Sequence, residues 1–407
     1  MSRKIKTKRD AGLLLGPLFY EFCCRLHWLT GNYDRKQDAL LFMSRGGLRL
    51  QYLYELFLNC NDLKSKTDLY PFWISRFAAV KLIFPVNPEL AVSHVVREFS
   101  YTDCRTMAAA LIPDQMYPDK YELLQTIPDD IGYAPVTRDN FFALFYHSCA
   151  YADKLRWHFH QQAEMGNAYL NNKFGSYQKL HTVDTGWFGS TLGSLQSGCQ
   201  KWKWDAIYFG RWNYRDEVPW YFYDIIPIMI DAVGLKGKNK IDIFLEYHHI
   251  IEAVLEPELP STEYYLPDGS SSSMIPDWKK RIAGDESEEM WMGVIEYFRS
   301  KPSTDINDVT KATQNALKFW KRALRYPTAE EAKILEVPAR SADFGKKDQT
   351  AIFGLEEHKT RKEYWAGIKR SLWPAGAIAI SSSRKSRWLK QLFWHIAKAC
   401  ISYRGAV

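Results

Sequence analysis

Two distant segments of the chain follow the same order: an apolar run, a turn containing glycine, and apolar residues at helical spacing. The first occupies residues 39–58 and turns through SRGG at 44–47. The second occupies residues 178–199, with a strand to 183, a loop over 184–190 and a helix from 191. A strand that enters a helix through a tight turn is the repeating unit of a parallel sheet with helical crossovers. This order predicts an α/β fold with a mainly parallel sheet.

The rest of the chain adds further expected elements, separated by proline and glycine. They are strands at 69–74 and 204–209, and helices at 11–29, 86–165 (including a long one over 138–164), 241–255, 288–298 and 309–324. We expect three regions: a core over 1–235 with a helical insertion at about 86–165, a mainly helical region over 236–383, and a tail over 384–407.

The formal charge of +7 is concentrated at the two ends of the chain. Residues 1–10 carry +4 and residues 384–407 carry +6, which leaves −3 for the remainder. A protein that binds nucleic acid along a broad surface needs a basic body. The distribution therefore argues against a nucleic-acid partner.

The tail has the pattern of an amphipathic helix. Its apolar residues share one face, and its basic residues gather towards the N-terminal end. The apolar set is Trp388, Leu389, Leu392, Phe393, Ile396, Ala397 and Cys400, and the basic set is Arg384, Lys385, Arg387 and Lys390. Such a helix could bind acidic lipid headgroups, or it could pack its apolar face on the body. Both interpretations remain open.

The cysteine pattern indicates a cytoplasmic protein. There are seven cysteines, an odd number, and none has C-x-x-C spacing, so we expect reduced thiols. The basic start MSRKIKTKRD precedes an apolar stretch that contains Glu21, Arg25 and His27. That stretch fits a buried helix better than a signal peptide, and no uncharged run is long enough to span a membrane.

The two turns have the chemistry of anion-binding sites. Backbone N–H groups and a helix N-terminus converge there, and glycine allows close approach of an oxygen. Arg45 with Gly46 and Gly47 suits a diphosphate. Gly189, Ser190 and Thr191 suit a phosphate monoester, and the Asp184 carboxylate suits vicinal sugar hydroxyls. Taken singly, each turn is equally compatible with ordinary loop geometry or a capped turn.

The two motifs in this order resemble type I phosphoribosyltransferases. More closely, the chain is similar to the phosphoribosyltransferase-like module that is often joined to a haloacid-dehalogenase-type phosphatase in bacterial surface-polysaccharide clusters. The stretches that carry the resemblance are GPLFYEF, LLFMSRGGL, DLYPFWISR, VDTGWFGST and FLEYHHIIEAVLEPELPSTEYYLPDG. The resemblance implies a sheet of the phosphoribosyltransferase type and transfer of a 5-phosphoribofuranosyl unit from phosphoribosyl pyrophosphate to a glycan.

The resemblance also implies roles for individual residues. The implied pyrophosphate ligands, with Mg²⁺, are Ser44, Arg45, Gly46, Gly47 and Arg76. Asp184 would hold the ribose hydroxyls, and the implied 5-phosphate ligands are Gly189, Ser190 and Thr191. The chain departs from the family where Thr185 replaces a second acid and where Trp187 and Phe188 enter a shortened loop. Those two aromatics could stack on an acceptor sugar or belong to the core.

Other catalytic groups are less well defined by the sequence. Glu246 is the candidate general base, with a helix-surface carboxylate as the alternative. His248 and His249 are adjacent, so we expect them on different helix faces, which makes them a poor metal site, and the metal ligands stay unknown. The chain contains no D-x-D, G-x-x-x-x-G-K-[ST], H-E-x-x-H or G-x-S-x-G motif. We therefore expect the phosphatase on a separate chain.

The resemblance thus implies a pentosyltransferase of bacterial O-antigen or capsule biosynthesis. Its acceptor would be a lipid-linked glycan, which the region over 236–383 would help to bind. It would act in the cytoplasm, held at the inner membrane through the basic tail. A non-catalytic phosphosugar-binding subunit of a polysaccharide assembly complex is the alternative. A third interpretation is nucleobase salvage, a function for which the large C-terminal region has no evident role.

Overall fold

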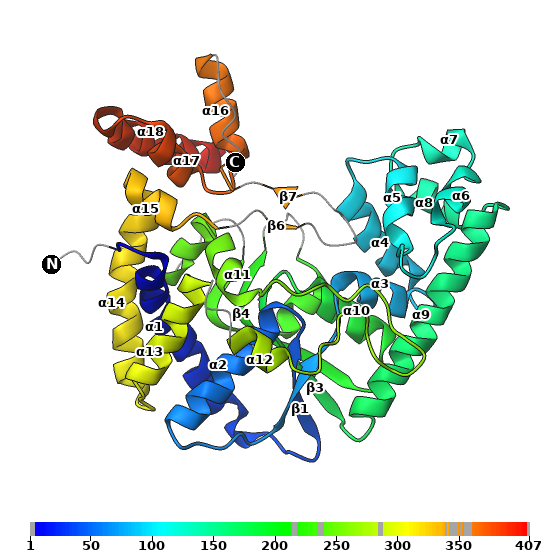
Figure 1. Cartoon of the computed structure of the whole chain (residues 1–407), viewed down its shortest axis with the longest axis horizontal. Coiled ribbons are helices and arrows are strands. Elements are labelled where there is room, and N and C mark those ends of the chain that lie inside the picture. Colours follow the sequence, from blue (N-terminus) through cyan, green and yellow to red (C-terminus); the bar gives the residue numbers. More distant parts are fainter. Residues whose placement is uncertain are drawn as a thin grey trace.

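The centre of the protein is a five-stranded parallel sheet with the strand order β2-β1-β3-β4-β5. The computed structural model describes residues 5–213, 218–233, 240–283, 288–337, 340–341, 349–350, 352–353 and 360–404. The strands are β1 (Asp38–Met43), β2 (Asp68–Phe72), β3 (Lys179–Trp187), β4 (Lys203–Asn213) and β5 (Ile225–Val233). The predicted α/β fold with a mainly parallel sheet is confirmed (Figure 1).

The chain reverses its direction across the sheet between β1 and β3. Helix α2 (Gly46–Cys60) leads from β1 to β2, whereas α10 (Ser190–Gly198) leads from β3 to β4, on the other side of the β1–β3 pair. Right-handed crossovers place two such helices on opposite faces of a sheet. Phe42 of β1 pairs with Val183 of β3, so the two carboxyl ends emerge side by side. In open α/β sheets, ligands bind in the crevice at such a point.

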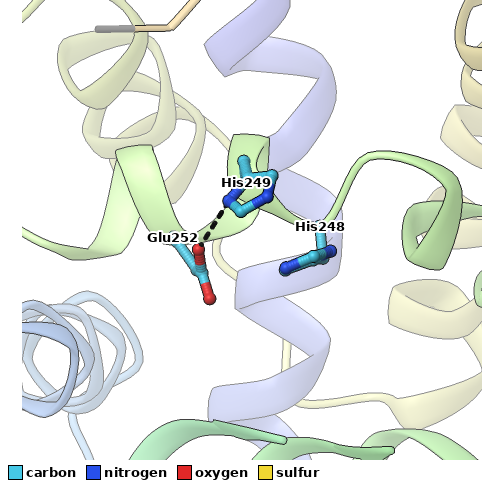
Figure 2. A group of neighbouring side chains, drawn as sticks. All are labelled: His248, His249 and Glu252. Carbon is cyan, nitrogen blue, oxygen red and sulfur yellow. Dashed lines mark hydrogen bonds and ion pairs between the residues drawn. The ribbon is translucent and has the colours of Figure 1, made fainter. Parts of the chain in front are cut away.

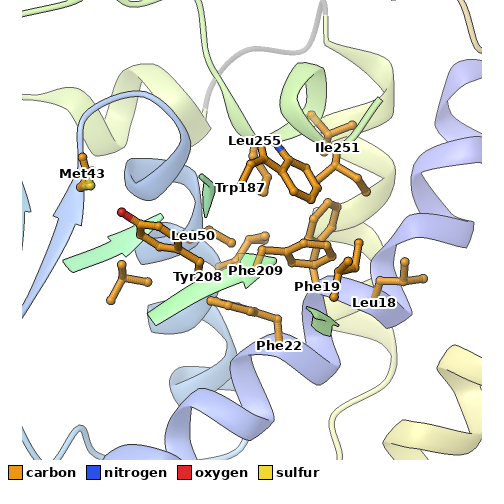
Figure 3. Close-up of a cluster of buried hydrophobic side chains, with 14 of the residues drawn as sticks. Leu18, Phe19, Phe22, Met43, Leu50, Trp187, Tyr208, Phe209, Ile251 and Leu255 are labelled. Atoms are coloured by element: carbon orange, nitrogen blue, oxygen red, sulfur yellow. The ribbon is translucent and has the colours of Figure 1, made fainter. Parts of the chain in front are cut away.

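Aromatic side chains hold helices against the two faces of the sheet. Phe209 of β4 packs on Phe19 and Phe22 of α1 (Lys8–Leu29), with ring centroids 5.5 and 5.9 Å apart (Figure 3). Phe72 of β2 stacks on Tyr169 of α9 (Ala150–Phe174) at 6.2 Å. Such ring pairs add about 0.5–1.5 kcal/mol each to the burial of the rings themselves. The sheet is thereby fixed between two helical layers.

The structure extends one predicted strand. β3 continues beyond residue 183 to Trp187, because Asp184 stays paired with Tyr208 of β4 and Gly186 with Gly210. Most of the segment expected to be a loop at 184–190 is therefore strand, and only two residues separate β3 from α10. The hydrogen-bond ladder to β4 decides this, and a pattern confined to one segment cannot show it.

Two predicted helices are divided, and one strand was not predicted. The helix expected over 241–255 consists of the 3-10 helix η3 (Lys240–Glu246) and α11 (His249–Leu255). The helix expected over 138–164 consists of α8 (Arg138–Phe145) and α9. β5 was missed because it contains Pro227 and lies at the sheet edge, where a strand tolerates proline.

The helices between β2 and β3 have a hydrophobic core of their own, built from side chains within residues 77–159. They lie beside the sheet, at the right of Figure 1. Besides α8 and α9 they are α3 (Arg76–Ile83), α4 (Pro88–Phe99), α5 (Cys104–Leu111), α6 (Lys120–Gln125) and α7 (Asp129–Gly132).

The chain after β5 is mainly helical. Its further helices are α12 (Trp278–Ala283), α13 (Glu289–Ser300), α14 (Ile306–Arg325), α15 (Ala329–Ile334), α16 (Arg361–Arg370), α17 (Pro374–Ser381) and α18 (Arg384–Arg404). Two short strands, β6 (Arg340–Ser341) and β7 (Gln349–Thr350), also follow β5, whereas the 3-10 helices η1 (Thr30–Asn32) and η2 (Trp220–Asp224) precede it. Helices α16–α18 stand together at the top of Figure 1. Trp373 anchors them, because its ring stacks on Tyr247 at 4.5 Å and its indole N–H donates to the Leu324 carbonyl.

Helix α18 turns apolar side chains to solvent. Trp388, Leu389, Phe393 and Ile396 are 54–61% exposed. A different side of the helix holds it in place, since the Gln391 amide donates to the Pro327 carbonyl. Packing of the apolar face on the body, one of the two interpretations of the tail, is wrong for these four residues. The side chain of Cys400 lies outside the described residues.

The other six cysteines, Cys23, Cys24, Cys60, Cys104, Cys149 and Cys199, are free thiols, and five of them are buried. Burial raises the pKa of the Cys104 thiol to about 11 and that of Cys199 to about 12, so both stay protonated and unreactive at neutral pH. Over the described part of the chain, no helix combines the length and the apolar character that crossing a membrane requires.

Candidate active site

The SRGG turn meets the end of β3 in the crevice between β1 and β3. Gly46 lies so close to β3 that a β-carbon on it would come 2.3 Å from Thr185 Oγ1 and 2.9 Å from Asp184 Oδ1. A β-carbon on Gly47 would come 2.5 Å from the Val183 carbonyl oxygen. Only glycine permits this approach of backbone to strand. The structure thus brings the first predicted turn against the acid of the second.

Arg45 supplies the positive charge of the SRGG turn. Its backbone is strained, with φ 72° and ψ −100°. Non-glycine residues seldom adopt positive φ, and those that do cluster at functional sites. Its guanidinium pairs with Glu256, which follows α11, at 3.9 Å. The Ser44 hydroxyl donates a hydrogen bond to the Ile74 carbonyl at 2.6 Å. Ser44 therefore ties the turn to the segment after β2.

Asp184 is a carboxyl that titrates near neutrality. Burial raises its pKa to about 7, and the negative charges of Glu256 and Glu252 act in the same direction. The Thr185 N–H and the Arg45 charge oppose this rise. Thr185 Oγ1 is itself buried and has no hydrogen-bond partner within the described residues. The site therefore combines an acid that can gain or lose a proton with a hydroxyl whose hydrogen-bonding capacity is unmet.

The second predicted anion-binding turn lies at the N-terminus of α10. Gly189 precedes this helix in the left-handed conformation, with φ 79°. Ser190 Oγ accepts a hydrogen bond from Arg97 Nη2 at 3.3 Å, and both Ser190 and Thr191 are buried. An arginine beside the positive end of a helix favours an anion there. Arg97 was not predicted as a site residue, because it lies at the end of α4 and only the packing of α4 near α10 brings it here.

Arg76 lies at the start of α3, after the carboxyl end of β2. Its guanidinium pairs with Glu98 of α4 at 3.8 Å. Glu98 follows Arg97 in the chain, so Arg76 is linked to the helix end that reaches Ser190. This ion pair places the Arg76 guanidinium on the α4 side of the site.

The two aromatic residues of the β3–α10 connection are packed in the core. Trp187 is 8% exposed and Phe188 is 5% exposed. Phe188 packs on Tyr221 and Phe222. Trp187 lies with Leu255 of α11 in the cluster of Figure 3, and its indole N–H donates to Glu252 at 2.9 Å. Of the two interpretations offered for these rings, the structure favours the core over stacking on an acceptor sugar.

Glu246, the predicted general base, is directed to the C-terminal helices. Its carboxylate pairs with Lys398 of α18 at 2.9 Å and with Arg325 of α14 at 4.0 Å. The carboxylates that affect Asp184 are instead Glu252 and Glu256. These two are four residues apart, so they share one side of α11 and its end, a spacing that the sequence could have revealed.

His248 and His249 lie together, contrary to the expectation of divergent faces. His248 precedes α11 and His249 begins it, and their ring centroids are 4.0 Å apart. His249 Nδ1 is 3.1 Å from Glu252 Oε2, and one ligand atom from each of the three residues lies within 4.8 Å of the others (Figure 2). The expectation failed because backbone position alone does not fix where a ring lies: His248 has helical backbone angles, and its side-chain direction brings the two imidazoles together.

A separate cavity of about 650 Å³ lies near the β5 edge. Its lining includes Glu21 and Arg25 of α1, Asp231 of β5 and Thr310 of α14. None of the predicted site residues lines it. Glu21 and Arg25 pair with each other at 2.6 Å, and Asp231 pairs with Arg211 of β4 at the same distance, so both acids have a basic partner.

No protein-family model matches the chain, and a search of curated proteins finds no relative.

Proposed function

We propose that this protein is a glycosyltransferase that uses phosphoribosyl pyrophosphate as donor and a lipid-linked glycan as acceptor, in bacterial O-antigen or capsule biosynthesis. The observation that carries the proposal is the contact of Gly46 with Asp184 and Thr185 at the point where the chain reverses across the sheet. A diphosphate-binding turn and a hydroxyl-binding acid then lie next to each other, as a phosphorylated pentose requires.

The donor would lie across the carboxyl ends of β1 and β3. Arg45 would exchange its long contact with Glu256 for the diphosphate, which offers bidentate partners. Asp184 would accept hydrogen bonds from the ribose hydroxyls. The 5-phosphate would lie at the N-terminus of α10, where Ser190, Thr191 and Arg97 gather. Transfer passes through an oxocarbenium-like state, so charge on the departing diphosphate must be stabilised.

Carboxylate oxygens of the site fit Mg²⁺, the metal that the resemblance implies. Asp184 and Glu256 are hard oxygen ligands. Burial raises the pKa of Asp184 and the negative charge of Glu256 raises it further, so a dication would relieve an excess of negative charge. Bound Mg²⁺ would help to neutralise the diphosphate leaving group. Glu246 is a poor candidate for the general base, because its carboxylate pairs with Lys398 and Arg325 and is directed to the C-terminal helices.

The phosphatase expected on a separate chain follows from the same proposal. The product of transfer would keep its 5-phosphate, because α10 holds that group and does not cleave it. Another protein would then remove it.

Two measurements test the proposed function. Calorimetry with phosphoribosyl pyrophosphate and Mg²⁺ should detect one donor per chain, and Arg45→Ala should weaken its binding at least tenfold. Incubation with lipid-linked oligosaccharides should release pyrophosphate and add the mass of one phosphopentose to the glycan. Absence of donor binding would contradict the proposal.

A second candidate is a non-catalytic phosphosugar-binding subunit of a polysaccharide assembly complex. The presence of one acid, Asp184, followed by Thr185 where the resembled family has an adjacent pair favours it. This candidate predicts donor binding without pyrophosphate release for every acceptor offered.

We also propose that α18 rests on the cytoplasmic face of the inner membrane. Its exposed apolar residues adjoin α16, where Trp365 contacts Phe393 at 5.5 Å. Both helices also carry exposed basic side chains, namely Lys362, Lys369, Arg370, Arg384 and Lys385. Apolar insertion together with attraction to acidic lipid is the binding mode of an interfacial helix. A lipid-linked acceptor would be reached from this position.

A further inference from the structure

We propose that His248, His249 and Glu252 form a site for a divalent transition-metal ion such as Zn²⁺. This site is distinct from the Mg²⁺ of the donor, and it does not depend on the proposed transferase activity.

The three side chains have the donor set and the spacing that such an ion requires. Their ligand atoms lie within 4.8 Å of one another, and each side chain is partly buried (Figure 2). Two imidazoles and one carboxylate are the protein ligands of open zinc sites, which keep a further position for water or substrate. Imidazole nitrogen also favours Zn²⁺ over Mg²⁺, which prefers oxygen ligands.

Backbone and side-chain positions together allow adjacent histidines to serve one ion. His249 and Glu252 are three residues apart on α11, so their side chains meet on one face. His248 immediately precedes α11 with helical backbone angles, φ −63° and ψ −24°. The direction of its side chain brings the imidazole to within 4.0 Å of the His249 ring, measured between centroids, and supplies the third ligand.

Surrounding tryptophans fix two of the three ligands. The Trp187 indole N–H donates to Glu252 Oε1 at 2.9 Å, which leaves Oε2 directed to His249. The His248 ring lies edge-on to Trp187 and to Trp212, at centroid distances of 5.6 and 5.5 Å. Hydrogen bonds of this kind orient metal ligands, and their loss commonly costs 10–100-fold in affinity.

Trp187 adopts this position at a conformational cost, since its φ is 81°. A tryptophan gains nothing from the left-handed region for its own packing, so the surrounding structure must hold it there. In this position, the Trp187 indole N–H orients the Glu252 carboxylate.

The chain offers a matched control on α9. His160 and Glu164 form another histidine–glutamate pair on a helix, 3.9 Å apart, and both side chains are more than half exposed. Among the described residues, His160 and Glu164 do not belong to any cluster of three potential metal ligands. This pair tests whether an ordinary helical pair suffices for binding.

Metal binding is measured on the full chain, stripped of metal and kept free of phosphoribosyl pyrophosphate. Calorimetry with Zn²⁺ and visible absorption with Co²⁺ should each show one ion per chain. His249→Asn, His248→Asn and Glu252→Gln should each weaken binding at least tenfold, and Trp187→Phe should weaken it 10–100-fold. The double variant His160→Asn with Glu164→Gln should bind as the parent does.

The thermal midpoint guards against misfolded variants. Zn²⁺ should raise it for the parent and the α9 control, and it should raise it less for His249→Asn. Absence of stoichiometric binding, or binding that survives both His249→Asn and Glu252→Gln, would overturn the proposal. A chain that binds Co²⁺ but no phosphoribosyl pyrophosphate would keep this site and lose the transferase, and the reverse result would do the opposite.

Discussion

Gly46 lies against Asp184 so closely that a β-carbon at residue 46 would come 2.9 Å from Asp184 Oδ1. The contact joins the start of α2 to the end of β3, and it makes the size of residue 46 critical to the crevice. Gly46→Ala should therefore displace Asp184 and Thr185. We expect a loss of about 1–3 kcal/mol in the free energy of unfolding, as for other overpacked positions, and weaker binding of phosphoribosyl pyrophosphate.

Gly31→Ala is the control for this substitution, because a β-carbon at residue 31 would meet no atom within 4 Å. Urea unfolding and donor calorimetry compare the two variants. If Gly46→Ala and Gly31→Ala had the same stability and bound the donor equally well, the close approach of residue 46 to β3 would have no importance for the site.

Asp184→Asn should make the protein more stable above neutral pH while it abolishes donor binding. Burial raises the folded-state pKa of Asp184 from 3.8 to about 7, so the stability that this group contributes is present at low pH and is lost as the pH rises through 7. Relative to Asp184→Asn, the parent should lose stability between about pH 4 and pH 7, by no more than ~4 kcal/mol.

Urea unfolding from pH 4 to pH 9 measures that difference. Asp268→Asn provides a control of opposite sign, because hydrogen bonds from Ser270 lower the pKa of the exposed Asp268. A parent that gains stability over Asp184→Asn as the pH rises would contradict the assignment.

His181 should contribute stability at acidic pH. It lies between two acids at the amino-terminal end of the sheet, with Nδ1 2.6 Å from Asp205 and Nε2 3.0 Å from Asp38. Burial lowers the pKa of His181, but the two carboxylates outweigh burial and raise it above 6.5. A raised folded-state pKa gives stability that is complete below the unfolded-state pKa and is lost as the pH rises through the folded value.

The stability difference between the parent and His181→Gln should therefore be largest near pH 5 and should shrink above neutrality. Urea unfolding at several pH values measures it, and NMR titration of the imidazole gives the pKa directly. An imidazole pKa below 6.5 would refute this account.

Replacement of the exposed apolar residues of α18 should abolish binding to acidic vesicles. Phe393→Glu combined with Leu389→Glu places two negative charges on the face that we propose to enter the lipid. Burial of apolar side chains and attraction between basic residues and anionic headgroups should both be weakened. Sedimentation with phosphatidylglycerol vesicles should retain the parent and release the double variant.

Val86→Glu is the matched control, because Val86 is 60% exposed and lies outside the C-terminal helices. It should sediment as the parent does, and salt should weaken binding of both proteins. Unchanged sedimentation of the α18 double variant would remove the membrane proposal.

The sequence alone determined the two strand–turn–helix units and therefore the parallel sheet. Hydrophobic period and glycine placement are local properties, and they located β1, the SRGG turn and α2 to within a residue or two. They could not show where β3 ends, because pairing of Asp184 and Gly186 with β4 extends it.

The tertiary structure decided which other residues reach the crevice. Arg97 arrives through the packing of α4, and Glu256 through the end of α11, positions set by contacts distant in the chain. Tertiary packing also buries Trp187 and pairs Glu246 with Arg325 and Lys398. It exposes the apolar face of α18 to solvent. The physical reason is the same in each case: a side chain's partners depend on the arrangement of whole elements, whereas its neighbours in sequence determine only the element itself.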